Sequence, residues 1–127
     1  MKTLLIDTHV LIWWLTEPSR LSSVCLDRLG SGDASVLVSA VTAYEIEFKR
    51  HADPLLQRLP ADLASAVFAE GFDWLPITPE DAILAGQLPR HHRDPWDRLL
   101  IAQGVRSRCP IVTKDSSFQV YDVELLW

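Results

Sequence analysis

The sequence predicts an α/β fold, a three-layer α/β/α sandwich around a central, mainly parallel sheet. Short, unbroken apolar runs recur along the chain, and segments with helical spacing of apolar residues lie between them. Unbroken apolar runs are typical of strands that are buried on both faces. Parallel strands also require crossover connections, which are usually helical. The predicted order of elements is β-α-α-β-α-α-α-β-α-α-β.

The predicted strands differ in how continuous their apolar runs are. Pro76 interrupts the run 74–77 and cannot donate to a sheet ladder, so we expect that strand to be short or at an edge. Residues 121–125 predict a further edge strand. The unbroken runs, which we expect to form buried strands, are 3–6, 35–39 and 110–113.

Capping residues mark the starts of several predicted helices. Thr78 precedes a proline and stands three residues before Asp81, which is a typical N-terminal helix sequence. Asp94 also precedes a proline, and Ser39 is placed to cap the helix that follows it. The predicted helices are 8–15, 22–29 with Gly30 past its end, 40–50, 54–59, 61–70, one from residue 79, and one from 95 to about 107.

Composition indicates an ordinary globular protein, which we expect to form a single domain over residues 1–127. The chain is 48% hydrophobic and 23% charged, and its net charge is −5. Cys25 and Cys109 lie far apart without a CxxC pattern, so we expect two reduced, buried thiols. No apolar run approaches the roughly 20 residues of a membrane span, and no cleavage site follows the apolar N-terminus. We therefore expect a cytoplasmic protein without membrane contact.

Several acids follow predicted strands or lie on the helices next to them. Asp7 ends the first apolar run, where a buried charge is costly unless it is compensated. Glu45 shares a helix face with apolar residues, which predicts that it points inward. Asp115 follows the strand that ends at Thr113, although an acid in a turn would explain it equally well. Because the carboxyl ends of parallel strands meet at one edge of a sheet, we expect these acids to gather there.

Asp94 and Asp97 open the same predicted helix and have different expected roles. Asp94 is placed as the N-cap, which is enough to explain it. Asp97 lies in the first turn, where it also favours the helix dipole or completes a capping box, and its face continues through apolar residues. We therefore expect Asp97 to belong to the site and Asp94 to act as a cap or outer neighbour.

Clustered carboxylates need a counter-charge, and a hard divalent cation such as Mg²⁺ or Mn²⁺ prefers oxygen ligands. This favours metal-assisted phosphodiester chemistry. Neutralising four carboxylates would leave a charge of −5 + 4 = −1, so a local basic patch could bind a polyanion. Lys49, Arg93 and Arg98 flank the acids and are candidates for contacts with RNA phosphates, although a solvated loop is the alternative. The histidines lack the spacing of a zinc site, and His9 is expected in packing or beside the ligands.

These motifs together resemble the PIN-domain ribonucleases and, within them, the VapC-type toxins of bacterial toxin–antitoxin pairs. The family's opening strand, metal-binding Asp and first helix resemble LLIDTHVLIWWL, which implies that role for Asp7. Its second strand and acid-bearing helix resemble VSAVTAYEIEFK, which implies the second acid at Glu45.

The C-terminal half of the chain carries the other two motifs of the resemblance. The most specific segment is LPRHHRDPWDRLLIAQ, which is similar to the third-acid motif and implies Asp97, with Asp94 beside it. The closing strand resembles IVTKDSSF, with a fourth acid at Asp115 after Thr113. Tyr44 and Trp96 stand where Trp and Phe are expected, and neither change removes a proposed ligand.

The resemblance implies a metal-dependent endoribonuclease that acts as a toxin and hydrolyses RNA phosphodiester bonds. It implies that Mg²⁺ or Mn²⁺ is held by the four acids, that the chain forms a homodimer and that a protein antitoxin inserts a segment near the acidic site. One alternative is a catalytically inactive PIN-like module that binds RNA or a protein. Another is a receiver-like module, suggested by Lys114, although the first strand carries one Asp and no Asp ends the run 35–39.

Overall fold

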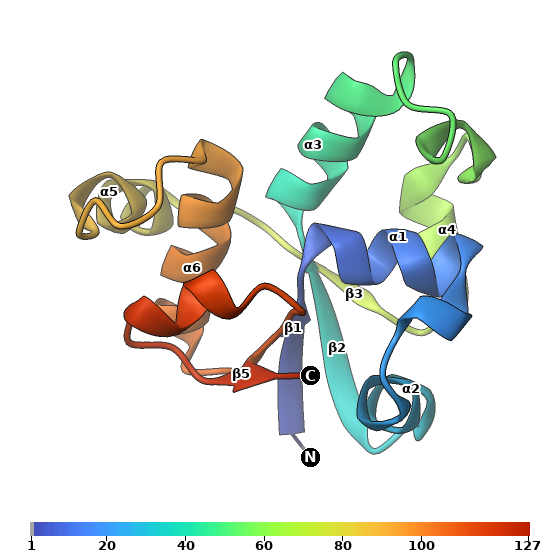
Figure 1. Ribbon diagram of the computed structural model, residues 1–127, viewed down its shortest axis with the longest axis horizontal. Helices are drawn as coiled ribbons and strands as arrows, with labels where there is room; N and C mark the ends of the chain where they lie inside the picture. Colours follow the sequence, from blue (N-terminus) through green and yellow to red (C-terminus); the bar gives the residue numbers. More distant parts are fainter. Residues whose placement is uncertain (1) are drawn as a thin grey trace.

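The computed structural model describes residues 2–127 and contains a five-stranded sheet at its centre (Figure 1). The strand order is β3-β2-β1-β4-β5, and every neighbouring pair is parallel. This confirms the predicted α/β class, and both predicted edge strands lie at the edges. The strands are β1 (Lys2–Ile6), β2 (Ala34–Ser39), β3 (Asp73–Leu75), β4 (Ile111–Val112) and β5 (Leu125–Leu126).

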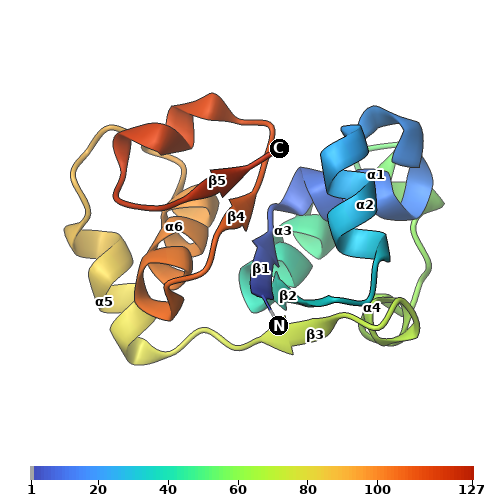
Figure 2. The same cartoon turned by 90° about the horizontal axis from the view of Figure 1, so that it is seen from below.

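Helices cover both faces of this sheet, as Figure 2 shows in the view from below. The α-helices are α1 (Thr8–Thr16), α2 (Ser23–Gly30), α3 (Ala40–Arg50), α4 (Leu63–Ala69), α5 (Pro79–Gln87) and α6 (Pro95–Ser107). Short 3₁₀ helices are η1 (Pro18–Arg20), η2 (Leu56–Arg58) and η3 (Ser116–Val120).

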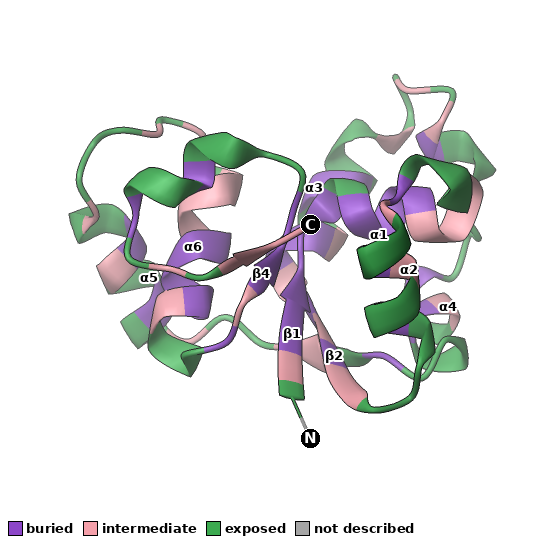
Figure 3. Ribbon diagram, turned by 60° about the horizontal axis from the view of Figure 1, so that its bottom comes forward, coloured by how far each residue is buried: buried purple, intermediate pink, exposed green. Residues whose placement is uncertain are grey.

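The alternation of side chains along each strand creates two cores, one on each face. Leu4 and Ile6 pack into a cluster with α1, α2 and α4, whereas Leu5, between them, packs with α6 and η3. Both faces are apolar, which explains why the strand sequence is continuous instead of alternating. Figure 3 shows the buried residues concentrated in β1, β4 and the sheet-facing sides of α1, α3 and α6.

Three segments differ from their predicted form. Helix α2 includes Gly30, because the chain makes its left-handed turn at Gly32, which has φ of +77°. Only Leu56–Arg58 of the predicted helix 54–59 is helical, and Arg50 donates to the carbonyls of Leu56 and Leu59 there. The last strand begins at Leu125 and not at residue 121, because residues 121–124 form a bend and an irregular segment after η3.

The strand order creates a switch point between β1 and β4. The chain moves outward from β1 to β2 and β3, and then returns to the other side of β1 through α5 and α6 to form β4. In parallel sheets a crevice opens outside the carboxyl ends of the strands at such a point. Receiver-like domains have the order 2-1-3-4-5, so the observed order excludes the receiver-like alternative.

Helix α6 approaches the sheet closely at Gly104. A Cβ atom at this position would lie 2.8 Å from Cδ1 of Ile111 in β4, so only glycine allows the contact. The C-terminal half of α6 therefore packs directly against β4. None of the helices within residues 2–127 has the length and apolar character that crossing a bilayer requires.

Candidate active site

Asp7 lies at the carboxyl end of the central strand, where its backbone N–H donates to the carbonyl of Val112 at 3.0 Å. Its side chain is buried, with 6% of the residue exposed, and its Oδ2 accepts a 2.6 Å hydrogen bond from Thr113 Oγ1. Burial raises the pKa of Asp7, although the Thr113 hydroxyl and nearby His9 partly offset this. The Thr113 hydroxyl and His9 therefore compensate this buried charge only in part.

Thr113 links Asp7 to Asp115 across the end of β4. The same hydroxyl oxygen that bonds Asp7 accepts a hydrogen bond from the Asp115 backbone N–H at 3.0 Å. Asp115 is exposed and caps η3 through a 2.9 Å bond from the Ser117 N–H to Oδ1. Burial alone would raise the pKa of Asp115, but the bonds from Ser117 and the adjacent His92 lower it. Asp115 is therefore ionised and fixed at the rim.

Glu45 reaches the edge from the middle of α3. It is 6% exposed, and its Oε2 accepts a 2.7 Å hydrogen bond from Lys49 Nζ one turn later. This bond raises the pKa of Lys49, with burial opposing it. Two contacts fix α3: Thr8 and Thr42 hydroxyls lie 2.9 Å apart, and Ser39 caps the helix while donating to Gln103 of α6. The helices that carry Glu45 and Asp97 are therefore tied together.

Asp94 and Asp97 have different surroundings at the start of α6. Asp94 Oδ1 accepts hydrogen bonds from the N–H groups of Trp96 at 2.9 Å and Asp97 at 3.4 Å, which confirms the cap. Asp97 does not complete a capping box, because its carboxylate turns toward the acid cluster. Burial raises the pKa of Asp97 to about 7, and the charges of the other acids add to the shift in the order Asp94, Asp7, Glu45 and Asp115.

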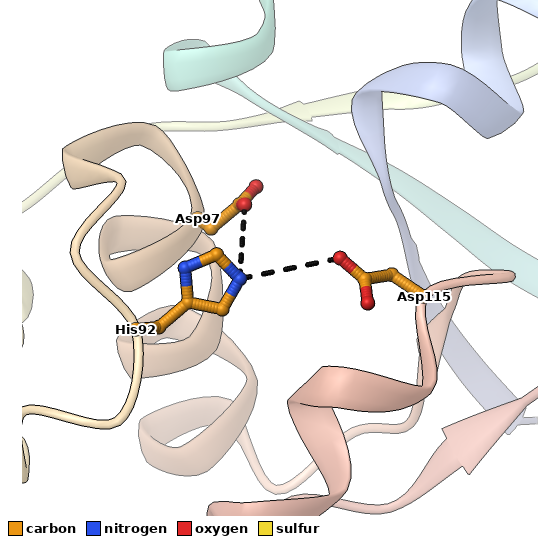
Figure 4. Close-up of side chains that lie close together, drawn as sticks. All are labelled: His92, Asp97 and Asp115. Carbon is orange, nitrogen blue, oxygen red and sulfur yellow. Dashed lines mark ion pairs between the residues drawn. The ribbon is translucent and has the colours of Figure 1, made fainter.

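His92 completes the cluster and was missed as a site residue by the sequence analysis. Its Nε2 lies 3.4 Å from Asp97 Oδ2 and 4.0 Å from Asp115 Oδ2, as Figure 4 shows. The spacing of the histidines argued against a zinc site and gave no other reason to select His92. A usable signal was its place two residues before Asp94, in a loop that must pass the acidic edge to begin α6.

The predicted RNA-binding residues have different surroundings. Lys49 is half-exposed and pairs with Glu45. Arg93 is exposed and, with Arg90 and His92, lines a hollow of about 600 Å³ beside the cluster.

The third predicted RNA-binding residue, Arg98, has another task. All five N–H groups of its guanidinium donate to backbone carbonyls, which belong to Ala85, Leu88, Pro89 and His92. We therefore assign Arg98 to holding the loop between α5 and α6 in place of the predicted RNA contact.

A second hollow, of about 370 Å³, runs from the acids along α1 and α3. His9 lies on its wall with its ring centroid 5.7 Å from that of Trp13, and Arg20 stacks over the same indole at 4.5 Å. This agrees with the packing role expected for His9. Glu45 and Lys49 line the same hollow, so an extended ligand along it would reach the acidic edge.

The donor set fits a hard divalent cation. Asp7, Glu45, Asp97 and Asp115 present carboxylate oxygens at one edge, and two of these groups have raised pKa values because burial and mutual repulsion oppose their charge. A divalent ion would relieve both causes, and Mg²⁺ and Mn²⁺ prefer oxygen ligands of this kind. The same geometry suits metal-assisted attack on a phosphodiester.

This chain is similar to known proteins in sequence and in fold. Residues 4–124 match the PIN domain family. Ribonuclease VapC22 of Mycobacterium tuberculosis is 32% identical over 116 residues, which cover 91% of this chain and 88% of the relative.

Solved structures agree in fold. VapBC2 from Rickettsia felis, bound to a DNA fragment from its promoter, gives a TM-score of 0.72 at 11% identity, covering 98% of this chain and 97% of that one. FitAcB from Neisseria gonorrhoeae gives 0.69 at 20% identity, covering 98% and 96%. Because residues 4–124 match the PIN domain family and VapC22 is 32% identical over 91% of this chain, the chain belongs to the PIN-domain family.

Proposed function

We propose that this protein is a metal-dependent endoribonuclease that hydrolyses RNA phosphodiester bonds, with Asp7, Glu45, Asp97 and Asp115 holding Mg²⁺ or Mn²⁺. The observation that carries the proposal is the gathering of these acids at the carboxyl edge of the sheet, where burial and the charges of the neighbouring acids raise the pKa of Asp97 to about 7. Four carboxylates that oppose one another's charge at a parallel-sheet switch point suit a cation and a phosphate substrate. The ribonuclease name of the 32% identical relative supports RNA as the substrate.

The chain's own residues would prepare the site for this reaction. Bound Mg²⁺ or Mn²⁺ supplies a Lewis acid that lowers the pKa of water and neutralises charge on the phosphate. Thr113 holds Asp7 through its 2.6 Å hydrogen bond and orients the Asp115 backbone, so both carboxylates keep fixed positions. Exposed Arg93 lies beside the cluster, where it can bind a flanking phosphate, and Lys49 holds Glu45 from the opposite side.

The physiological role that we propose is that of a toxin paired with a protein antitoxin. Two solved structures of similar fold, a toxin–antitoxin complex from Klebsiella pneumoniae and VapBC-5 of the VapBC family of toxin–antitoxin systems from Mycobacterium tuberculosis, support such a partner. We also propose a cytoplasmic homodimer that folds as one domain over residues 1–127. Exposed Tyr44 and Phe48 on α3 cluster with Trp96 at the start of α6, which supplies apolar surface for a partner beside the site.

Cleavage of total RNA by purified protein tests the proposal. Wild type should cleave with Mg²⁺ or Mn²⁺ and stop when EDTA is added, whereas Asp97→Asn should not cleave, because the substitution removes the charge that anchors the ion. Asp81→Asn is the control, since it makes the same chemical change at a buried carboxylate that lies in a capping box at the start of α5. Equal cleavage by wild type and Asp97→Asn would point to a contaminating nuclease and leave only the inactive RNA- or protein-binding module.

A further inference from the structure

His92 lies in a loop, but contacts fix both its backbone and its imidazole ring. A residue that only attracts a polyanion by its charge would not need such contacts. Its backbone N–H donates to the Tyr121 hydroxyl at 2.7 Å, and its carbonyl accepts from Arg98 at 3.0 Å. Tyr121 is itself fixed by donating to the Pro89 carbonyl at 2.9 Å. The imidazole packs edge-on against the buried ring of Phe118, with centroids 5.6 Å apart. Backbone and ring are therefore both positioned before any ligand binds.

The imidazole presents Nε2 to two carboxylates from different elements. Figure 4 shows Asp97 from α6 and Asp115 from the end of β4 turned toward this nitrogen. One ligand atom from each of the three residues lies within 4.8 Å of the other two. Ligands on one octahedral ion lie about 3 Å apart when adjacent and about 4.2 Å apart when opposite, for metal–ligand distances of about 2.1 Å. Nitrogen–oxygen separations of 3.4 and 4.0 Å therefore suit a shared ion with small side-chain adjustments.

We propose that His92 is a direct metal ligand, and that it forms a donor set of one nitrogen and two oxygens with Asp97 and Asp115. This inference rests on the metal-dependent function proposed above and adds a ligand to the four acids. Asp7 and Glu45 complete the other side of the edge with oxygen donors only.

A nitrogen ligand changes which cation the site prefers. Mg²⁺ takes oxygen ligands almost exclusively and retains its waters, whereas imidazole suits transition metals. The His92 side should therefore favour Mn²⁺ over Mg²⁺. An interpretation without a metal ligand is that His92 only pairs electrostatically with the two acids, and the experiment must separate the two.

Pulsed electron paramagnetic resonance of Mn²⁺ bound to the full chain makes that separation. Coordination by an imidazole should produce ¹⁴N modulation of the Mn²⁺ echo in wild type, and His92→Ala should remove it. His91→Ala and His9→Ala are matched controls that should retain it, because exposed His91 packs edge-on against Tyr121 and His9 packs at a tilt against Trp13. Labelling wild type with ¹⁵N-histidine should also abolish the ¹⁴N modulation. This measurement needs no substitution that could unfold the chain.

Calorimetry supplies the second measurement. His92→Ala should weaken Mn²⁺ binding by about 10-fold or more and Mg²⁺ binding by less. The ratio of Mn²⁺ affinity to Mg²⁺ affinity should therefore fall. Mn²⁺ bound by wild type without nitrogen modulation, or modulation that persists in His92→Ala, would overturn the ligand assignment while leaving the proposed nuclease intact. No Mn²⁺ or Mg²⁺ binding by wild type would overturn the metal-dependent function itself.

Discussion

Asp81 and Asp7 are buried to a similar degree, at 4% and 6% exposed, but their carboxylates behave in opposite ways. Asp81 accepts hydrogen bonds from the Thr78 N–H at 3.0 Å and from Arg106 at 2.8 Å. Burial alone would raise the pKa of Asp81, but these partners lower it. Within residues 2–127, Asp7 accepts a side-chain hydrogen bond from Thr113 and forms no ion pair with a Lys or Arg. Burial raises its pKa, and Thr113 and His9 offset this only in part.

Asp81 is an acid that stabilises the fold, whereas the charges of Asp7 and Asp97 are opposed by burial and by neighbouring carboxylates. Asp81 is satisfied within the chain, so an added ligand has nothing to gain there. Asp7 and Asp97 carry an electrostatic cost that only a cation would remove. Burial of a carboxylate therefore indicates a site only when its partners are counted.

The largest expected effect is loss of activity at the acidic edge. Asp7→Asn should lower metal-dependent cleavage by about 100-fold or more, the size found when one electrostatic stabiliser is removed from an active site. Its free energy of unfolding without metal should not fall, because a poorly compensated buried charge disappears while the amide oxygen still accepts from Thr113. Cleavage assays and urea unfolding in EDTA measure both. A large loss of stability would show that Asp7 resembles Asp81.

At the start of α5 we expect a loss of stability without a loss of activity. Asp81→Ala should lower the free energy of unfolding by about 1–3 kcal/mol, because it removes a capping box and leaves Arg106 without its partner. Cleavage per folded molecule should stay near that of wild type. Urea unfolding with a parallel cleavage assay tests this, and a loss of activity without a loss of stability would contradict the comparison.

The two kinds of acid should respond to pH in opposite directions. The pKa of Asp97 in the fold, about 7, exceeds its ordinary value of 3.8, so the folded state binds more protons between these values. The metal-free protein should therefore lose stability as pH rises from about 4 to about 7. Asp81, whose pKa is lowered, should contribute stability above its ordinary value that is lost as pH falls through it. Unfolding from pH 4 to 8 in EDTA should show a shallower decline for Asp97→Asn, and an identical decline would exclude Asp97 as its source.

A smaller effect should follow from removing the Asp94 carboxylate that caps α6. Asp94→Ala should cost about 1 kcal/mol of stability, because two N–H groups lose their acceptor. Cleavage should fall less than in Asp97→Asn. Parallel melts and cleavage assays check this, and equal losses of activity would make Asp94 a member of the ligand set.

The smallest effect concerns the basic rim. In an Asp97→Asn background, which should bind RNA without cutting it, Arg93→Ala should weaken binding a few-fold and reduce the salt slope by about 0.7–1. Arg98→Ala should instead lower stability, because its N–H groups hold the loop carbonyls. Binding titrations at several salt concentrations separate the two, and an unchanged slope in Arg93→Ala would remove Arg93 from the interface.

Local sequence was sufficient for the elements with strong, local physical signals. Continuous apolar runs identified the buried strands because both faces of the sheet are covered, and Thr78, Ser39 and Asp94 marked helix starts because capping is a contact within a few residues. The weak element, 54–59, is shorter than predicted because Leu59, which precedes Pro60, has an extended backbone and ends the helical turn at Arg58.

Tertiary structure decided what the candidate acids and bases do. The sequence determined which carboxylates follow strands, and their motifs determined the family, but it did not place His92 between Asp97 and Asp115. Nor did it show that the Arg98 guanidinium donates its hydrogen bonds to four backbone carbonyls while Arg93 remains exposed. These outcomes depend on partners distant in sequence, such as Tyr121 and Phe118, which fix the loop only after β4 and η3 have packed against α6.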